Sequence, residues 1–92
     1  MASIPEKMPD LISRTLDDGA VIVSPDEGTV KVLNQVGSLI WSSIDGNRTI
    51  AQIGQIVVEE FDVTIEQAQD DIRMFVQDLC AKRLLRLSNT NT

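Results

Sequence analysis

The 92-residue sequence has no histidine and no tyrosine, and it has only one cysteine. Histidine is the most common general base, metal ligand and proton switch near neutral pH, so its absence removes the usual starting point for an active site. Cys80 cannot form a disulfide within the chain, which fits a reducing cytoplasm. Because no histidine is available to activate the thiol, we interpret Cys80 as a small apolar side chain and expect that the protein is not an enzyme.

Basic residues are outnumbered, with 8 against 14 acidic residues and a formal net charge of −6. Surfaces that bind nucleic acid need lysine and arginine to neutralise phosphates, so the composition disfavours a nucleic-acid partner. Lys82, Arg83 and Arg86 are close together, but they lie near a predicted helix C-terminus, where cations interact favourably with the helix dipole. No apolar run is long enough to span a membrane, and residues 1–10 lack the pattern of a secretory signal, so we expect no membrane partner.

Phosphate-binding loops and metal-binding patterns are missing as well. The five glycines are scattered and form neither a dinucleotide-binding motif nor a P-loop. Asp70, Asp71 and Asp78 lie on one predicted helix, and no second element is predicted to bring further ligands to them. We therefore predict no catalytic residue, no metal site and no cofactor, and a small enzyme or metal protein is kept as an alternative hypothesis only.

The first part of the sequence predicts a small antiparallel sheet. Residues 20–24 and 29–33 are rich in β-branched side chains, and residues 25–28 between them, Pro-Asp-Glu-Gly, are typical of a hairpin turn. Residues 11–16 alternate weakly between apolar and polar side chains and predict an edge strand. Residues 1–10 contain two prolines and mixed charges, and we expect them to form a flexible arm.

Three predicted helices follow the sheet. Apolar residues recur at helical spacing over about 35–44, 49–60 and 65–82. A residue that can cap the helix N-terminus precedes or opens each one, namely Asn34, Thr49 and Thr64. Trp41 belongs to the apolar stripe of the first helix, so we expect it in the core.

These elements predict an α+β fold of the winged helix-turn-helix type, with an N-terminal three-stranded antiparallel sheet followed by three helices. We expect one domain over residues 11–87, in which 84–87 add a brief strand, and a disordered polar tail over 88–92.

The segment from Leu33 to Ile53 reads LNQVGSLIWSSIDGNRTIAQI, and Phe-Asp-Val follows at 61–63. In this order the residues Leu-Asn, Gly, Ile-Trp, Ile-Asp-Gly and Arg-Thr-Ile resemble the PqqD-like family, and the resemblance covers about residues 20–87. It implies a domain that recognises the leader part of ribosomally made peptides (RiPPs) during their modification. The Ile-Trp pair and the short free-standing chain are most similar to the stand-alone recognition proteins of lasso-peptide pathways.

The resemblance also implies where the leader peptide binds. In the family it adds as an extra strand beside the strand that corresponds to 29–33, in a groove bounded by the helix that corresponds to 65–82. Carried over, the resemblance implies peptide-binding residues on both elements, namely Thr29, Val30, Lys31, Val32, Leu33, Asp71, Met74, Phe75 and Asp78.

Within this set, the residues on the helix would have different roles. Phe75, extended by Met74, would form a hydrophobic wall, and Asp71 and Asp78 would meet basic leader residues. Helical spacing places these four residues on one flank. Lys31 could instead protect the strand edge against unwanted pairing.

The resemblance implies a non-catalytic adaptor that presents the leader to a separate processing enzyme, such as a leader peptidase. One alternative is a peptide chaperone for a radical enzyme in pyrroloquinoline quinone (PQQ) biosynthesis. Another is a winged-helix protein that binds nucleic acid, which the acidic charge disfavours.

Overall fold

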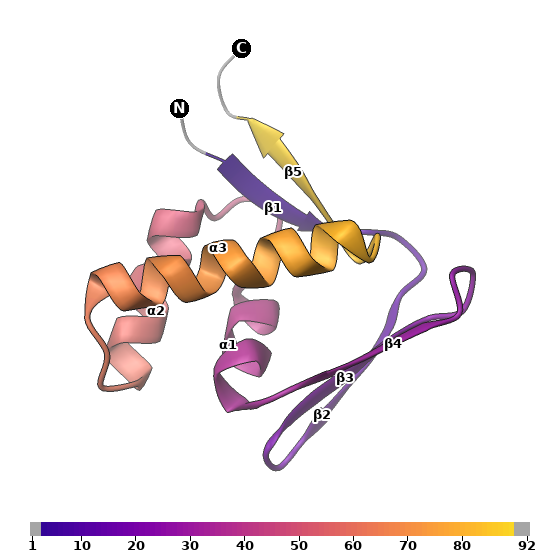
Figure 1. Cartoon of the computed structure of the whole chain (residues 1–92), viewed down its shortest axis with the longest axis horizontal. Helices are drawn as coiled ribbons and strands as arrows, with labels where there is room; N and C mark the ends of the chain where they lie inside the picture. The colour runs from indigo at the N-terminus through magenta and orange to yellow at the C-terminus, as the bar shows by residue number, and fades with distance from the viewer. Residues whose placement is uncertain (1–2, 90–92) are drawn as a thin grey trace.

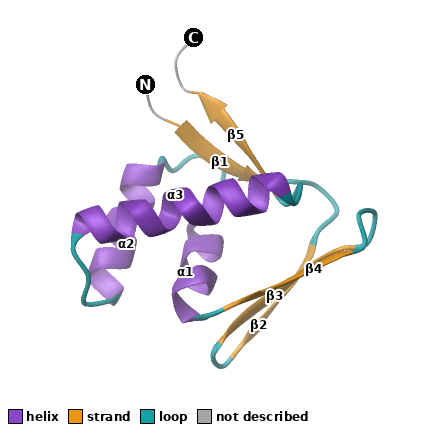
Figure 2. Cartoon of the chain, in the orientation of Figure 1, coloured by secondary structure: helices purple, strands orange, loops and turns teal. Residues whose placement is uncertain are grey.

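The computed structural model of the chain describes residues 3–89. It has an α+β fold in which three helices pack between a three-stranded and a two-stranded antiparallel sheet (Figure 1, Figure 2). The elements along the chain are β1 (Ser3–Lys7), β2 (Ile12–Leu16), β3 (Gly19–Ser24), β4 (Thr29–Leu33), α1 (Gln35–Ser43), α2 (Ile50–Glu60), α3 (Ile65–Ala81) and β5 (Leu85–Asn89). The predicted fold class, with its three-stranded sheet followed by three helices, is confirmed.

The three-stranded sheet has the order β2-β3-β4, so β3 is its central strand. One side of β3 is buried in the core through Ala20 and Ile22, and α1 packs against β3 and β4. The hairpin between β3 and β4 turns at Gly28, whose φ of +65° is a conformation that glycine adopts at little cost. The hairpin thus has the turn chemistry that the sequence predicts.

Each helix begins directly after the predicted capping residue. The Asn34 side chain accepts a hydrogen bond from the Gly37 amide at 2.8 Å. Thr49 forms a capping box with Gln52, whereas at α3 the Thr64 side chain accepts a hydrogen bond from the Gln67 amide without the reciprocal bond. Because caps are local signals, the predicted starts of α1 and α3 agree with the structure, and the predicted start of α2 at residue 49 is one residue early.

The core lies where the three helices meet β3 and the start of β5. Its fully buried large side chains include Ile22, Ile40, Ile53, Val57, Ile72, Val76, Leu79 and Leu84. The two helical glycines, Gly37 and Gly54, allow close packing: a Cβ atom on Gly54 would lie 3.3 Å from side-chain atoms of Ile65 and Gln69 on α3. Trp41 is buried in this core, which confirms its predicted place.

The expected flexible arm over residues 1–10 is wrong for β1. Strand β1 pairs with β5 in antiparallel register, from Ser3 opposite Asn89 to Lys7 opposite Leu85 (Figure 1). Pro5 is compatible with this two-stranded sheet because each strand has an edge where no amide donor is required, and its ring is buried.

The predicted disordered tail is likewise wrong for residues 88 and 89, which belong to β5; residues 1, 2 and 90–92 lie outside the described part. The brief strand expected at 84–87 is therefore longer, and the domain extends beyond the predicted limits of 11 and 87. No local pattern indicates this pairing, because the two strands come from opposite ends of the described chain.

Candidate functional site: the free edge of β4

Strand β4 lies at one edge of its sheet, and within residues 3–89 no strand pairs with its outer side. Its side chains alternate: Val30 and Val32 are 62% and 68% exposed on one side, whereas Leu33 is buried on the other. A strand at an edge leaves part of its backbone N–H and C=O groups unpaired, and these groups can template a further strand. The edge therefore offers backbone groups with which an extended peptide could pair.

Lys31 does not protect this edge by projecting into solvent. Its side chain lies on the inner side of β4, with Nζ 3.0 Å from Oδ2 of Asp78 on α3. Asp78 also accepts a hydrogen bond from Lys82, one helical turn further along α3. The three side chains tie the edge strand to the third helix, and we call them the Lys31–Asp78–Lys82 triad.

The triad carries two positive charges and one negative charge. The hydrogen bond from Lys82, and then that from Lys31, lower the pKa of Asp78, so its carboxylate is ionised well below neutral pH. Because both lysines already engage this carboxylate, the geometry does not favour the expected contact between Asp78 and a basic leader residue. A net positive triad favours an acidic group instead.

Phe75 and Gly37 show which flank of α3 faces the sheet. A Cβ atom on Gly37 would lie 3.4 Å from Cε2 of Phe75 and 3.4 Å from Cβ of Leu33. Phe75 therefore lies over the start of α1, next to the end of β4, and it is half-buried there. With Asp78 against Lys31, this places the flank carrying Phe75 and Asp78 toward β4.

The other two residues predicted on this flank are Asp71 and Met74, and neither has a polar partner on β4. The Asp71 carboxylate accepts a hydrogen bond from Nε2 of Gln67 at 2.9 Å, within α3 itself. Met74 is 69% exposed. The structure thus brings Lys31, Phe75 and Asp78 together and gives Asp71 and Met74 no polar partner on β4.

Gly19 is a residue whose role the sequence did not reveal. A Cβ atom on Gly19 would lie 1.8 Å from the carbonyl oxygen of Leu33, so only glycine fits where β3 passes the end of β4. In the sequence Gly19 follows two aspartates, a pattern that is typical of a turn and indicates nothing more. Its actual role is to let the backbone of β4 approach closely, which fixes the position of the edge strand.

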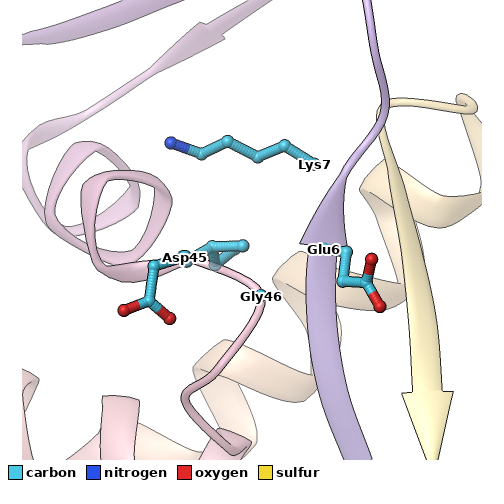
Figure 3. A pocket seen from close by; sticks show the side chains of 5 residues that line it. Glu6, Lys7, Asp45 and Gly46 are labelled. Atoms are coloured by element: carbon cyan, nitrogen blue, oxygen red, sulfur yellow. The ribbon is translucent and has the colours of Figure 1, made fainter.

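A separate pocket of about 240 Å³ lies between β1 and the turn that links α1 to α2 (Figure 3). Lys7 extends over the Trp41 ring, with Nζ 4.7 Å from the ring centroid, and burial lowers the Lys7 pKa. Asp45 accepts hydrogen bonds from the backbone amides of Asn47 and Arg48, which lower its pKa and hold the turn. These contacts are explained by local structure and indicate no chemistry.

The remaining candidates for reactive groups are few. Burial raises the pKa of the Cys80 thiol, which suits the apolar role expected for it. In the described residues no cluster of three or more histidine, cysteine or acidic side chains could hold a metal ion. None of the helices in that part of the chain is long and apolar enough to cross a membrane.

Residues 19–85 match the family described as "Coenzyme PQQ synthesis protein D (PqqD)", and the chain therefore belongs to the PqqD family. The match includes all of the candidate site, from Gly19 to Lys82, and it confirms the resemblance seen in the sequence. A "PqqA binding protein" from Xanthomonas euvesicatoria pv. vesicatoria (strain 85-10) is 34% identical over 70 residues, which are 76% of this chain and 74% of the relative. The "PqqA binding protein" of Rhizobium meliloti (strain 1021) is 28% identical over 67 residues, 73% of this chain and 66% of the relative.

Solved structures share the fold. One is TbiB1 in complex with the TbiA(beta) leader peptide, which is 28% identical, has a TM-score of 0.80 and covers 88% of this chain and 94% of its own. Another is a lasso peptide synthetase B1 complexed with the leader peptide, with 22% identity, a TM-score of 0.78 and coverage of 89% and 96%. The arrangement of helices and strands described above is therefore that of known proteins.

Proposed function

We propose that the protein binds the leader segment of a ribosomally synthesised precursor peptide as an added strand on the free edge of β4. The observation that carries this proposal is the unpaired edge of β4 beside α3, in a chain of the PqqD family. Backbone hydrogen bonds along the edge would supply affinity, and side-chain contacts on its two sides would supply selectivity.

The contacts of the edge suggest which leader residues fit. On the inner side, Phe75 offers a partly exposed aromatic side chain, and Lys31 with its triad partners offers net positive charge. On the outer side, Val30 and Val32 offer exposed apolar surface. A leader strand with an apolar residue for Phe75 and an acidic residue for the triad would complement this site.

The solved relatives support a finer proposal. TbiB1, which is 28% identical, is solved with a leader peptide, and a lasso peptide synthetase B1 that is also solved with a leader peptide shares the fold. We therefore infer a non-catalytic adaptor that acts in the cytoplasm and presents the leader to a separate leader peptidase of a lasso-peptide pathway. This inference adds a partner enzyme to the peptide-binding role.

A second candidate rests on the curated relatives, which are PqqA binding proteins with 28% to 34% identity. In that case the chain would deliver a PqqA-type peptide to a radical enzyme in PQQ biosynthesis. The two candidates differ in the peptide bound, so one titration with each peptide separates them.

The test is calorimetric titration of the full chain with the leader peptide encoded beside its gene, using a scrambled leader as the control. We expect a Kd in the micromolar range or tighter. Binding weaker than about 100 μM, or about −5.5 kcal/mol, would contradict the proposal.

Two proline variants locate the binding edge. Along a strand, successive N–H groups point to opposite sides, and proline removes one of them. Of Lys31→Pro and Val32→Pro, one therefore disrupts pairing with β3 and the other removes a donor only from the free edge. Circular dichroism identifies the variant that keeps its fold, and this variant should lose leader binding. If the folded variant binds as tightly as the wild type, the leader binds elsewhere.

A further inference from the structure

The side of the three-stranded sheet that faces away from the helices is almost entirely apolar. The register places Ile12, Val23 and Val30 in one row across the sheet. The next row has Arg14, Val21 and Val32, and Leu16 completes the surface at the end of β2. We call this surface the outer face, and its residues are Ile12, Arg14, Leu16, Val21, Val23, Val30 and Val32.

The outer face has no covering element within residues 3–89, since α1 packs on the opposite side of the sheet (Figure 1). Ile12 is 59% exposed and Leu16 is 47% exposed. Part of the face forms a hollow of about 430 Å³ lined by Ile12, Arg14, Leu16, Val21 and Val23. A two-sided sheet normally turns polar residues toward water, and a contiguous exposed apolar patch marks an interaction site.

Strand β2 shows that the apolar character of the outer face is not a consequence of core packing. All five of its residues are exposed, and the polar side chains Ser13 and Thr15 point to the side of the sheet that elsewhere forms the core. Its apolar side chains, Ile12 and Leu16, point to the outer face instead. The strand therefore places its apolar side chains where no element of residues 3–89 covers them.

The charge of the face argues against a second copy of this chain as that molecule. Arg14 is the only charged residue among the seven, and within residues 3–89 no carboxylate oxygen lies within 4.0 Å of its guanidinium group. In a two-fold dimer the same patch meets itself, which would bring two arginines together in the apolar contact. A partner with an apolar patch and a carboxylate complements the face better.

The size of the face points to a composite surface. Three strands of five or six residues cover about 250 Å², whereas a specific interface buries about 800 Å² on each partner. Val30 and Val32 lie on the strand that, under the proposed function, receives the leader. Alternate side chains of an added strand would continue the outer face and widen it by about a third.

We propose that the processing enzyme docks on the outer face, that a carboxylate of the enzyme pairs with Arg14, and that the bound leader strand forms part of the same surface. This inference rests on the proposed function. It predicts that the enzyme binds the leader-loaded protein more tightly than the free protein, because the surface is complete only after loading.

The test measures binding of the purified leader peptidase encoded in the same gene cluster to the leader-loaded full chain by biolayer interferometry. We expect Leu16→Thr and Arg14→Glu each to weaken this binding by about tenfold or more, as at interface hot spots. Both should leave leader affinity within about twofold of wild type, since neither residue lies on β4. Threonine has a high β-propensity, so Leu16→Thr should keep the strand and the fold intact.

Leu87→Thr is the matched control, because Leu87 is 49% exposed but belongs to β5 in the other sheet. It should change neither binding step. If the wild type binds leader but enzyme binding is insensitive to Leu16→Thr and Arg14→Glu, this inference fails and the proposed function stands. If the wild type binds no leader, both fail. A wild-type dimer that Leu16→Thr converts to a monomer in sedimentation would show that a second copy covers the face, which overturns the inference.

Discussion

The two sheets of the protein differ in how much of their apolar surface the chain itself buries. In the β1–β5 sheet each strand keeps a free edge within residues 3–89, but the base of the sheet belongs to the core: Pro5, Leu84 and Leu85 are buried there, and Glu6 pairs with Arg86 and accepts a hydrogen bond from Ser88. The three-stranded sheet has a free edge at β4 and an uncovered apolar outer face.

This difference suggests different roles for the two sheets. The two-stranded sheet contributes to the stability of the fold, and the three-stranded sheet offers surface to a partner. Residues around the two-stranded sheet complete the core and join the two ends of the chain. Strands β2 and β4 contribute little buried surface of their own beyond Leu33, and they display backbone and apolar groups that a partner could use. Variants in the two regions should therefore have different effects on unfolding and on leader binding.

The largest expected difference is between Leu84→Ala and Leu16→Ala. Leu84 is fully buried where the turn after α3 enters β5, so its truncation leaves a cavity and should lower the free energy of unfolding by about 2–5 kcal/mol. Leu16 is 47% exposed, and its truncation should change that free energy by about 0.5 kcal/mol or less. Urea unfolding followed by Trp41 fluorescence measures both. Equal losses would show that the outer face supports the fold.

A glycine variant in each region sharpens the comparison. Gly19→Ala places a methyl group against the Leu33 carbonyl oxygen and should cost about 1–3 kcal/mol of unfolding free energy. Because that carbonyl lies at the end of β4, leader affinity should fall as well. Gly46→Ala, in the α1–α2 turn at φ +81°, should cost about 1–2 kcal/mol through backbone strain and leave leader affinity unchanged. Denaturant unfolding and calorimetry together check both effects, and parallel behaviour of the two variants would contradict the assigned role of Gly19.

The elements that sequence reasoning located are those fixed by local signals. Asn34, Thr49 and Thr64 cap the helices that they were expected to cap, and Gly28 turns the predicted hairpin. Strand β1 was missed because its partner β5 lies at the other end of the chain, and a sequence containing Pro5 has a weak strand pattern by itself.

The candidate site shows the same contrast between local signals, which the sequence reveals, and contacts between distant residues, which it does not. The residue pattern and the family resemblance indicated β4 and one flank of α3, but Lys31 and Asp78 were given separate roles. Only the fold brings Nζ of Lys31 to 3.0 Å from Asp78, and this contact changes the charge that a bound peptide would meet. The steric need for Gly19 also depends on a backbone atom of another strand, so no local pattern could reveal it.

The smallest predicted effect concerns the ion pairs. Hydrogen bonds from Lys82 and Lys31 lower the pKa of Asp78, so the folded state favours the ionised form. A carboxyl group with a lowered folded-state pKa stabilises the fold above its unfolded pKa of about 3.9, and this contribution is lost as the pH falls through the folded-state value. Because the Asp78 side chain is 40% exposed, solvent screening keeps the contribution below about 1 kcal/mol.

Unfolding free energies of wild type and Asp78→Asn should therefore differ by a constant amount from pH 7 to pH 5, and the difference should shrink below about pH 4. Asp70→Asn removes the same charge from an exposed pair with Arg73 that does not reach β4, so its effect on leader affinity should be negligible. Asp78→Asn, by contrast, releases Lys31 and Lys82 and should increase the affinity for an acidic leader. Urea titrations at each pH and calorimetry at pH 7 measure these quantities. Weaker binding in Asp78→Asn would show that the carboxylate itself contacts the leader, as the family resemblance first implied.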